Sequence, residues 1–243
     1  MSTQAPSIHI QGSISIAENR LIETLDMDIK AGAWSCLLGA SGVGKSTLLH
    51  LIAGLTEHIR FEGSLTTNDR LPLEGRIAYM AQTDLLLPWL SILDNVLIGQ
   101  RLRGEPIQQN RAETLLEALG LQNHRHQYPS QLSGGQRQRA ALARTLMEER
   151  DIILLDEPFS ALDAGTRAQM QELSAQWLKG KTVLHVTHDP GEAARLGEQI
   201  FLLQAHRLQT LDVPALSIPR PVDDPQTLAC QGRLLRILRE VAG

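Results

Sequence analysis

The sequence predicts an α/β protein built around a parallel sheet, because strand-like and helical patterns alternate along the chain. The strand patterns are short aliphatic runs, namely WSCLLG (34–39), DIILLDEP (151–158), TVLHVTH (182–188) and QIFLLQA (199–205). Runs of this length without alternation are typical of strands that are buried on both faces. Segments with helical periodicity separate them, as in a sheet whose strands are joined by crossover helices.

Two regions depart from this alternation. Residues 1–35 and 60–80 show strand alternation with turn residues, which favours antiparallel β structure. Residues 84–150 are almost wholly helical in pattern, and Ser91 with Asp94 forms a helix-start signal there. We therefore expect one domain over residues 1–243. Its predicted parts are an α/β core with a β subdomain (1–83 and 151–205), an inserted helical subdomain (84–150) and a tail with one helix (206–243).

Composition and charge argue against several classes of protein. The chain has 243 residues and a formal net charge of -4, so its overall charge does not favour binding to nucleic acid. Its 2 cysteines are too few for a disulfide framework and suit a reducing compartment such as the cytoplasm. The sequence starts without the features of a signal peptide, and no apolar run is long enough to span a bilayer. We expect any role at a membrane to depend on a partner.

The segment GASGVGKST (39–47) fits the phosphate-binding pattern G-x-x-x-x-G-K-[ST] between an expected strand and an expected helix. Its glycines let the backbone approach phosphate groups, Lys45 can reach the terminal phosphates, and the Ser46 hydroxyl can bind Mg²⁺. A glycine turn that merely starts a helix is the structural alternative. The predicted nucleotide-binding residues of this glycine loop are Gly39, Ala40, Ser41, Gly42, Val43, Gly44, Lys45, Ser46 and Thr47.

Two acidic residues follow the aliphatic run IILL at the end of another expected strand. Asp156 lies where a carboxylate would hold Mg²⁺, and Glu157 points to the other side of the strand. A carboxylate at Glu157 can orient an attacking water and accept its proton, an effect of about 10²- to 10⁴-fold on the rate. Kinases with a similar glycine loop share the first acid, so Glu157 is the residue that favours hydrolysis.

The segment QLSGGQRQRAALA (131–143) opens an alanine-rich helix with a serine and two glycines. Ser133 and Gln136 form a capping-box pattern, so a simple helix start is one interpretation. The other is anion binding, because Gly134 and Gly135 expose backbone amides where a phosphate can sit. Together with the glycine loop and LLDEP, this LSGGQ resembles the signature of the ATP-binding-cassette ATPases. The resemblance extends over nearly the whole chain.

The resemblance implies roles for further residues. Gln82 matches the family's Q-loop glutamine, which contacts Mg²⁺ and the attacking water, and His188 matches the switch histidine that contacts the γ-phosphate. The D-loop would consist of Ser160, Ala161, Leu162 and Asp163. ATP is the implied substrate; the implied Mg²⁺ ligands are Ser46, Gln82 and Asp156, and the implied catalytic residues are Glu157, His188 and Gln82.

The resemblance also implies a use for a second phosphate-binding helix start. In that family two chains pack head to tail. The signature residues Ser133, Gly134, Gly135 and Gln136 would therefore cover the ATP held by the partner's glycine loop. ATP would stabilise a homodimer that separates after hydrolysis. One position departs from the family: Ile16 stands near the place where an aromatic residue stacks on adenine, so apolar packing would replace stacking there.

The segment DLLLPWLSILDNV (84–96) follows Gln82 and gathers Leu85, Leu86, Leu87 and Trp89 around a proline. These residues either belong to the core of the helical subdomain or form a contact surface for a membrane permease. With HDPGEAARLGEQIFLL (188–203), the segment resembles importer ATPases of the nitrate, sulfonate and taurine type, including the branch linked to pyrimidine precursors of thiamine. That resemblance implies a peripheral subunit on the cytoplasmic face of the inner membrane. Its partners would be permease subunits and, indirectly, a periplasmic solute-binding protein.

Two other functions remain as alternatives. A mechanical ATPase of the same family, acting on ribosomes or DNA, usually has two cassettes or a long coiled-coil insertion, and the sequence shows neither. A kinase with a similar glycine loop would leave LSGGQ and His188 without a role. The sequence therefore favours an ATP-hydrolysing importer subunit, and it does not identify the solute.

Overall fold

The computed structural model describes residues 5–204 and 206–242, and the chain divides into two compact units. The first unit contains residues 1–77, 151–156 and 179–243, and the second contains residues 78–150 and 157–178. The second unit thus takes residues 157–178 together with the stretch predicted to be helical. The predicted single domain over 1–243 with its subdivision stays a prediction, and its residues 1–4, 205 and 243 lie outside the described residues.

The first unit contains a parallel sheet with the strand order β8-β3-β7-β6. Its strands are β3 (Trp34–Gly39), β6 (Ile152–Asp156), β7 (Thr182–Val186) and β8 (Gln199–Gln204). Every residue of β3, β6 and β7 is buried, as expected for strands covered on both faces. Helix α1 (Lys45–Ile52) follows β3, and helix α6 (Pro190–Leu196) follows β7. The aliphatic runs of the sequence are therefore the core strands.

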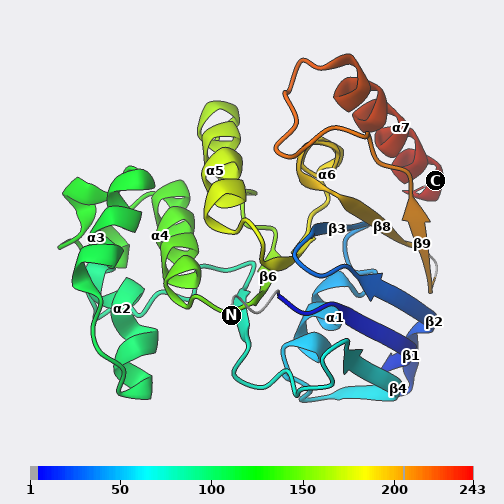
Figure 1. The fold of residues 1–243 in the computed structure, drawn as a ribbon, viewed down its shortest axis with the longest axis horizontal. Helices are drawn as coiled ribbons and strands as arrows, with labels where there is room; N and C mark the ends of the chain where they lie inside the picture. The colour runs from blue at the N-terminus through cyan, green and yellow to red at the C-terminus, as the bar shows by residue number, and fades with distance from the viewer. Residues whose placement is uncertain (1–4, 205, 243) are drawn as a thin grey trace. The chain divides into compact units, whose positions relative to one another are not determined.

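In the same unit β4, β1 and β2 form an antiparallel part of the sheet. Strand β9 lies between β2 and β8, parallel to β2 and antiparallel to β8. The bounds are β1 (Ile8–Ile16), β2 (Asn19–Ile29), β4 (Ile59–Thr67) and β9 (Arg207–Leu211). Gly12 faces Gly63 across the β1–β4 pair, and a side chain at either position would collide with the opposite backbone. The two glycines therefore allow these strands to approach closely. Helix α1 packs against β4 (Figure 1).

The second unit is mainly helical. Its helices are α2 (Ile92–Arg103), α3 (Gln109–Ala118), α4 (Gly134–Met147) and α5 (Ala164–Trp177), and short 3₁₀ turns lie at Gln122–His124 and Pro129–Gln131. Strand β5 (Ile77–Met80) spans the boundary between the units. Helices α2, α3 and α4 pack against one another (Figure 1). The predicted cap of α2 is confirmed, because the Ser91 side chain accepts a hydrogen bond from the Asp94 amide.

Within the first unit, the buried Arg220 connects the C-terminal segment to the end of helix α6. Helix α7 (Pro225–Ala242) packs on α6 (Figure 1). Arg220, only 1% exposed, donates hydrogen bonds to the carbonyl oxygens of Ala194 and Gly197 at the end of α6. It also donates to the carbonyls of Leu216 and Pro214. No helix among the described residues has the length and apolar character needed to cross a membrane.

Candidate functional site

The loop between β3 and α1 has the backbone shape of a phosphate cradle. Gly42 and Gly44 have φ angles of 80° and 106°, left-handed values that favour glycine. Gly44 is the N-cap of α1, and no side chain of the described residues caps this helix start. A helix start of this kind favours an anion, because its backbone amides and the helix dipole both attract negative charge.

Lys45 places a positive charge inside this loop. Its side chain is only 6% exposed, and its ammonium donates hydrogen bonds of 2.8 Å to the carbonyl oxygens of Gly39 and Ala40. Two neutral carbonyls of the loop therefore contribute to the hydrogen bonding that a buried charge requires. A phosphate oxygen is a stronger acceptor for the same ammonium, because charge-assisted hydrogen bonds are about twice as strong as neutral ones.

The carboxyl ends of β3, β7 and β6 meet at one edge of the sheet. Leu37 of β3 lies opposite Val186 of β7, which in turn lies opposite Asp156 at the end of β6. The Thr187 amide continues this register with a 3.1 Å hydrogen bond to the Leu37 carbonyl. The glycine loop follows β3 directly and His188 follows Thr187, so the structure brings both to the edge where buried Asp156 lies.

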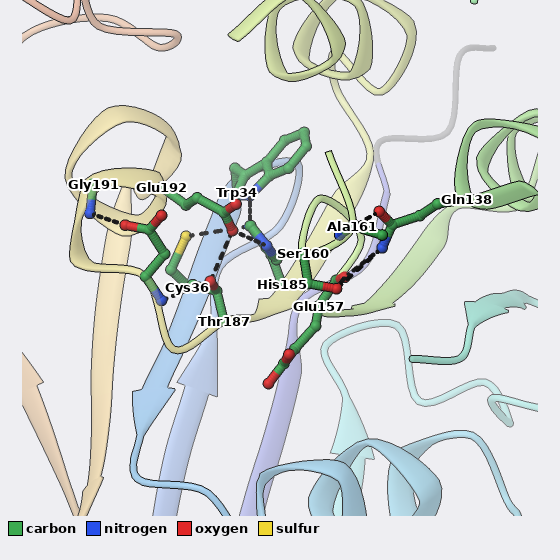
Figure 2. Close-up of polar contacts among 11 residues, drawn as sticks. Trp34, Cys36, Gln138, Glu157, Ser160, Ala161, His185, Thr187, Gly191 and Glu192 are labelled. Carbon is green, nitrogen blue, oxygen red and sulfur yellow. Dashed lines mark hydrogen bonds and ion pairs between the residues drawn. The ribbon is translucent and has the colours of Figure 1, made fainter. Parts of the chain in front are cut away.

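A buried carboxylate supports the backbone on either side of His188, whose own side chain is exposed. Glu192 of α6 accepts a 2.7 Å hydrogen bond from the Thr187 hydroxyl and lies 3.3 Å from the His185 imidazole (Figure 2). The Thr187 hydroxyl oxygen also accepts a hydrogen bond from the Asp189 amide. The Thr187 hydroxyl and the Glu192 carboxylate therefore hold the loop that carries His188 in place.

Trp34 and Cys36 complete this buried cluster. The Trp34 indole donates a 3.4 Å hydrogen bond to Nδ1 of His185, and the Cys36 sulfur lies 3.9 Å from the same nitrogen (Figure 2). Burial raises the pKa of the Cys36 thiol far above its ordinary value. Cys36 is thus a neutral packing residue, because only the thiolate is reactive.

In the second unit, Glu157 has an unusual backbone. Its φ is 49°, in the left-handed region, which costs a residue other than glycine about 1–2 kcal/mol. The Gln82 side-chain amide donates a 3.3 Å hydrogen bond to the Glu157 carboxylate. The structure therefore brings two predicted catalytic residues together at a strained position, and strain of this kind clusters at functional sites.

The start of α4 combines the two interpretations of LSGGQ. The Ser133 hydroxyl accepts a hydrogen bond from the Gln136 amide, and the Gln136 side chain accepts one from the Ser133 amide at 2.8 Å. The capping box is therefore present. Ser133 and Gly134 are exposed at the same time. Gly135 lies against the predicted D-loop, since a Cβ added there would come within 3.2 Å of the Ala161 carbonyl.

Gln138, two residues beyond the signature, links α4 to the segment from Glu157 to Ala161. Its side-chain nitrogen donates hydrogen bonds to the Glu157 carbonyl at 3.0 Å and to the Ser160 hydroxyl at 3.2 Å (Figure 2). Its side-chain oxygen accepts a 2.9 Å hydrogen bond from the Ala161 amide.

The predicted D-loop continues with buried Leu162 and with Asp163. The pKa of Asp163 is lowered by a hydrogen bond from the Thr166 amide at the start of α5. A hollow of about 190 Å³ lies beside this contact, lined by residues 80–84, Gly134, Arg137, Gln138, Ser160 and Ala161.

The predicted permease contact divides into core and surface. Leu86 is buried and Leu87 is half-buried, whereas Leu85 and Trp89 are 62% and 70% exposed. Buried Asn95 shapes this turn, because its amide hydrogen-bonds both the amide and the carbonyl of Leu87. The described structure therefore leaves two of the four apolar side chains on the surface. Ile16, the residue predicted to contact the base, is 37% exposed at the end of β1.

The sequence profile that matches this chain covers residues 22–160 and is described as ABC transporter. The chain belongs to the ABC transporter family. It is an ATP-binding cassette, so ATP is its substrate and hydrolysis of ATP is its reaction. The LSGGQ resemblance is confirmed by this match, and the rival assignment to the kinases is excluded.

Curated relatives of this ABC ATPase cover most of its length. An uncharacterized ABC transporter ATP-binding protein of Haemophilus influenzae is 44% identical over 93% of this chain and 95% of that protein. The aliphatic sulfonates import ATP-binding protein SsuB 2 of Streptomyces avermitilis is 39% identical over 96% and 91%. The protein named SsuB in Shigella flexneri serotype 5b is 42% identical over 84% and 79%.

Solved structures confirm the predicted α/β P-loop fold of this ABC ATPase. One is described as the dimeric, post-hydrolysis state of the ATP-binding cassette MJ0796 bound to ADP and Pi. It superposes with a TM-score of 0.73 at 30% identity and covers 84% of this chain and 99% of that chain. A dimeric structure of the same cassette gives a TM-score of 0.72.

Several residues of this ABC ATPase have positions that sequence reasoning missed. Gln138 lies in the sequence RQRAALAR, which looks like the solvated face of a helix, yet it is 6% exposed and its side-chain amide is hydrogen-bonded at both the nitrogen and the oxygen. Glu192, Asn95 and Arg220 are likewise buried polar residues that hold loops in place. A polar residue inside an apolar helical face gives a weak signal for such a role, but it does not name the partner.

Proposed function

We propose that this ABC ATPase hydrolyses ATP to drive the uptake of a small organic solute through a membrane permease. The register of β3, β7 and β6 carries the proposal, because it collects the glycine loop, Asp156 and His188 at one edge of the sheet. Ligands of open α/β sheets bind outside the carboxyl ends of the strands. That edge is therefore the place for the triphosphate.

The glycine loop would bind the phosphates through the amides at the start of α1 and through Lys45. The Ser46 hydroxyl and the Asp156 carboxylate are oxygen donors of the kind that Mg²⁺ prefers, and Asp156 is only 3% exposed at the strand end. When bound, the ion would neutralise charge on the transferred phosphate. The third predicted ligand, Gln82, and the contact of Ile16 with the base stay predictions.

Glu157 would orient the attacking water and accept its proton. Support comes from its half-buried carboxylate and from the Gln82 amide, which donates a hydrogen bond to that carboxylate. His188 would donate to the γ-phosphate from a loop that Glu192 holds in position. Positioned hydrogen-bond donors of this kind stabilise the charge that develops as the phosphate leaves.

Two copies of the chain would close head to tail around two ATP molecules. Each would place Ser133, Gly134, Gly135 and Gln136 on the nucleotide held by its partner. The exposure of Ser133 and Gly134 and the dimeric state of the MJ0796 structures support this proposal. ATP stabilises such a pair because it binds the closed form more tightly than the open one.

The permease would dock on the surface formed by Leu85 and Trp89. Large apolar side chains that are this exposed mark partner sites, and Asn95 fixes the turn that presents them. The carbonyls of Asp84 and Leu85 accept hydrogen bonds from Arg144 of α4, so movement of this surface would reach the signature helix. The ATPase would be a peripheral subunit on the cytoplasmic face of the inner membrane.

The solute class is best supported by the relatives named as aliphatic sulfonate import proteins. We propose a small sulfonate, delivered to the permease by a periplasmic binding protein. Nitrate, taurine and a pyrimidine precursor of thiamine are the competing solutes of the predicted importer type. The ATPase itself does not contact the solute, so the permease has to be present in the decisive measurement.

The test is purification of the tagged chain from solubilised membranes, followed by reconstitution of the complex in vesicles. We expect permease subunits to copurify and labelled alkanesulfonate uptake to depend on ATP and on the binding protein. Copurification of ribosomes or DNA, without membrane subunits, would favour the mechanical alternative. Uptake of a thiamine precursor in place of a sulfonate would overturn the solute proposal alone.

The role of Glu157 is tested in the same preparation. Glu157→Gln should slow phosphate release by about 10²- to 10⁴-fold and accumulate an ATP-bound dimer, because the base is lost while the fold is kept. Glu117→Gln, an exposed change in α3, is the matched control and should leave turnover unchanged. Normal turnover in Glu157→Gln would remove Glu157 from the mechanism.

A further inference from the structure

The buried side-chain amide of Gln138 forms hydrogen bonds through both its nitrogen and its oxygen, and all of its partners lie in residues 157–161. Its nitrogen donates to the Glu157 carbonyl and the Ser160 hydroxyl, and its oxygen accepts from the Ala161 amide. The side chain is 6% exposed, so water does not replace these bonds easily. Figure 2 shows the amide directed at the turn that contains all three partners.

This turn has the unusual backbone of Glu157. The Glu157 carbonyl accepts two hydrogen bonds of 3.0 Å, one from Gln138 and one from the Ser160 hydroxyl. A left-handed φ of 49° at a glutamate persists only where surrounding groups hold it. The direction of the Glu157 side chain depends on that φ, and the same carboxylate accepts the hydrogen bond from Gln82.

Only a glutamine satisfies all three partners from this position on α4. Glutamate keeps the acceptor for the Ala161 amide but has no donors for the Glu157 carbonyl. Asparagine keeps both functions on a side chain that is one methylene shorter. Methionine matches the size of glutamine and removes both functions, so it separates the hydrogen bonds from the packing.

We propose that Gln138 is a positioning residue for ATP hydrolysis. It fixes the Glu157 carbonyl and the Ala161 amide relative to the signature helix α4. The proposal rests on the proposed role of Glu157 as the base. Ser133, the N-cap of α4, lies five residues before Gln138, about 7.5 Å along the helix axis. A nucleotide bound at the signature therefore acts, through one rigid helix, on the backbone of the base in the same chain.

The first test replaces Gln138 by methionine and uses Gln100→Met as the matched control. Gln100 is also a buried glutamine of the second unit, and its side-chain oxygen accepts a hydrogen bond from the amide of Gln108, which is not a predicted site residue. We expect Gln138→Met to lower kcat about 10- to 100-fold while the KM for ATP changes less than twofold. Gln100→Met should lose similar thermal stability and keep its kcat.

The second test combines Gln138→Met with Glu157→Gln. If Gln138 acts through Glu157, the methionine should lower the residual turnover of the Glu157→Gln protein less than twofold, because the two residues act as a unit. Amide hydrogen exchange at Ala161 should accelerate in Gln138→Met and stay unchanged in Gln100→Met. If Gln138→Met fails to fold, Gln138→Asn replaces it in each comparison, because its amide is one methylene too short to satisfy all three partners.

Three results would overturn the proposal: unchanged kcat in Gln138→Met, an equal loss in Gln100→Met, or a full further loss on the Glu157→Gln background. Normal turnover in Glu157→Gln is a different outcome, because it contradicts the proposed base itself. A loss in Glu157→Gln without any loss in Gln138→Met contradicts only the positioning role.

Discussion

Helix α1 follows Gly44 and helix α4 begins with two glycines, but the two helix starts satisfy their backbone amides in different ways. Gly44 caps α1 with a left-handed backbone and no side-chain hydrogen bond, whereas Ser133 and Gln136 form a closed capping box at α4. An amide without an internal partner gains most from a ligand, and an amide already capped gains least. We therefore propose that the α1 start can bind phosphate by itself, whereas the α4 start adds to a nucleotide site that another chain provides.

The charges at the two helix starts differ in the same sense. Lys45 is a buried cation that donates to two carbonyls, while the signature offers two neutral, exposed residues, Ser133 and Gly134. Loss of a charged partner costs more than loss of a neutral one. We therefore expect the largest effects on nucleotide binding from the first site, and smaller, dimer-specific effects from the second.

The largest effect is expected from Lys45→Met. Hydrogen bonds to charged groups contribute about 1.5–3 kcal/mol, so ATP affinity should fall about 10- to 150-fold. Isothermal titration with the monomeric protein measures this affinity. Lys181→Met is the control, because Lys181 pairs with Asp151 in the same unit, outside the glycine loop. Equal losses in both variants would contradict a specific role for Lys45.

The next effect is expected from Ser133→Asp. Aspartate is a good N-cap, so α4 should keep its stability, but its charge would repel the phosphates of the partner's ATP. ATP-driven dimerisation in the Glu157→Gln background should weaken at least about tenfold, which corresponds to about 1.4 kcal/mol. Binding of ATP to the single chain should not change. Sedimentation at several protein concentrations separates these two quantities, and a dimer of normal affinity would contradict the trans contact.

A smaller effect comes from removing the caps alone. Ser91 caps α2 as Ser133 caps α4, so Ser91→Ala and Ser133→Ala should each cost about 1 kcal/mol of unfolding free energy. Urea denaturation measures both losses. Only Ser133→Ala should also weaken the ATP-bound dimer. If both variants dimerise equally, the serine of the signature is a helix cap and nothing more.

The smallest expected effect is on the pH dependence of the unfolding free energy, through Asp94. The Ser91 hydroxyl, and then Arg101, lower the pKa of Asp94 below its ordinary value of about 3.9. The stability that this carboxylate contributes is present above the ordinary pKa and is lost as pH falls through the lowered one. Wild type should therefore exceed Ser91→Ala in unfolding free energy by less at about pH 3 than at about pH 6. Urea denaturation at both pH values measures this difference. A constant difference would assign the whole effect to the backbone cap.

The sequence predicts well what depends on neighbours along the chain. The glycine loop, the acids after IILL and the caps at Ser91 and Ser133 are local patterns, and each lies where its pattern indicates. The order of the parallel strands was not predicted, although their aliphatic runs were. Residue spacing carries no direct information on which strands become neighbours.

Contacts between distant segments could not be predicted for the same reason. Gln138 meets residues 157–161 only after the chain has folded, and its sequence context, RQRAALAR, looks like an ordinary helix surface. The run from Leu85 to Trp89 divides into buried and exposed side chains because Asn95 bends the chain there. A helical pattern cannot anticipate that bend.

The buried guanidinium of Arg220 has a practical consequence for protein engineering. If the chain were cut before this residue, the carbonyls of Ala194 and Gly197 would lose their donor inside the protein. Burying such groups without partners costs about 1–3 kcal/mol each. Fluorescent or affinity tags are therefore better attached beyond α7, and removing the tail would destabilise α6, the helix that follows His188.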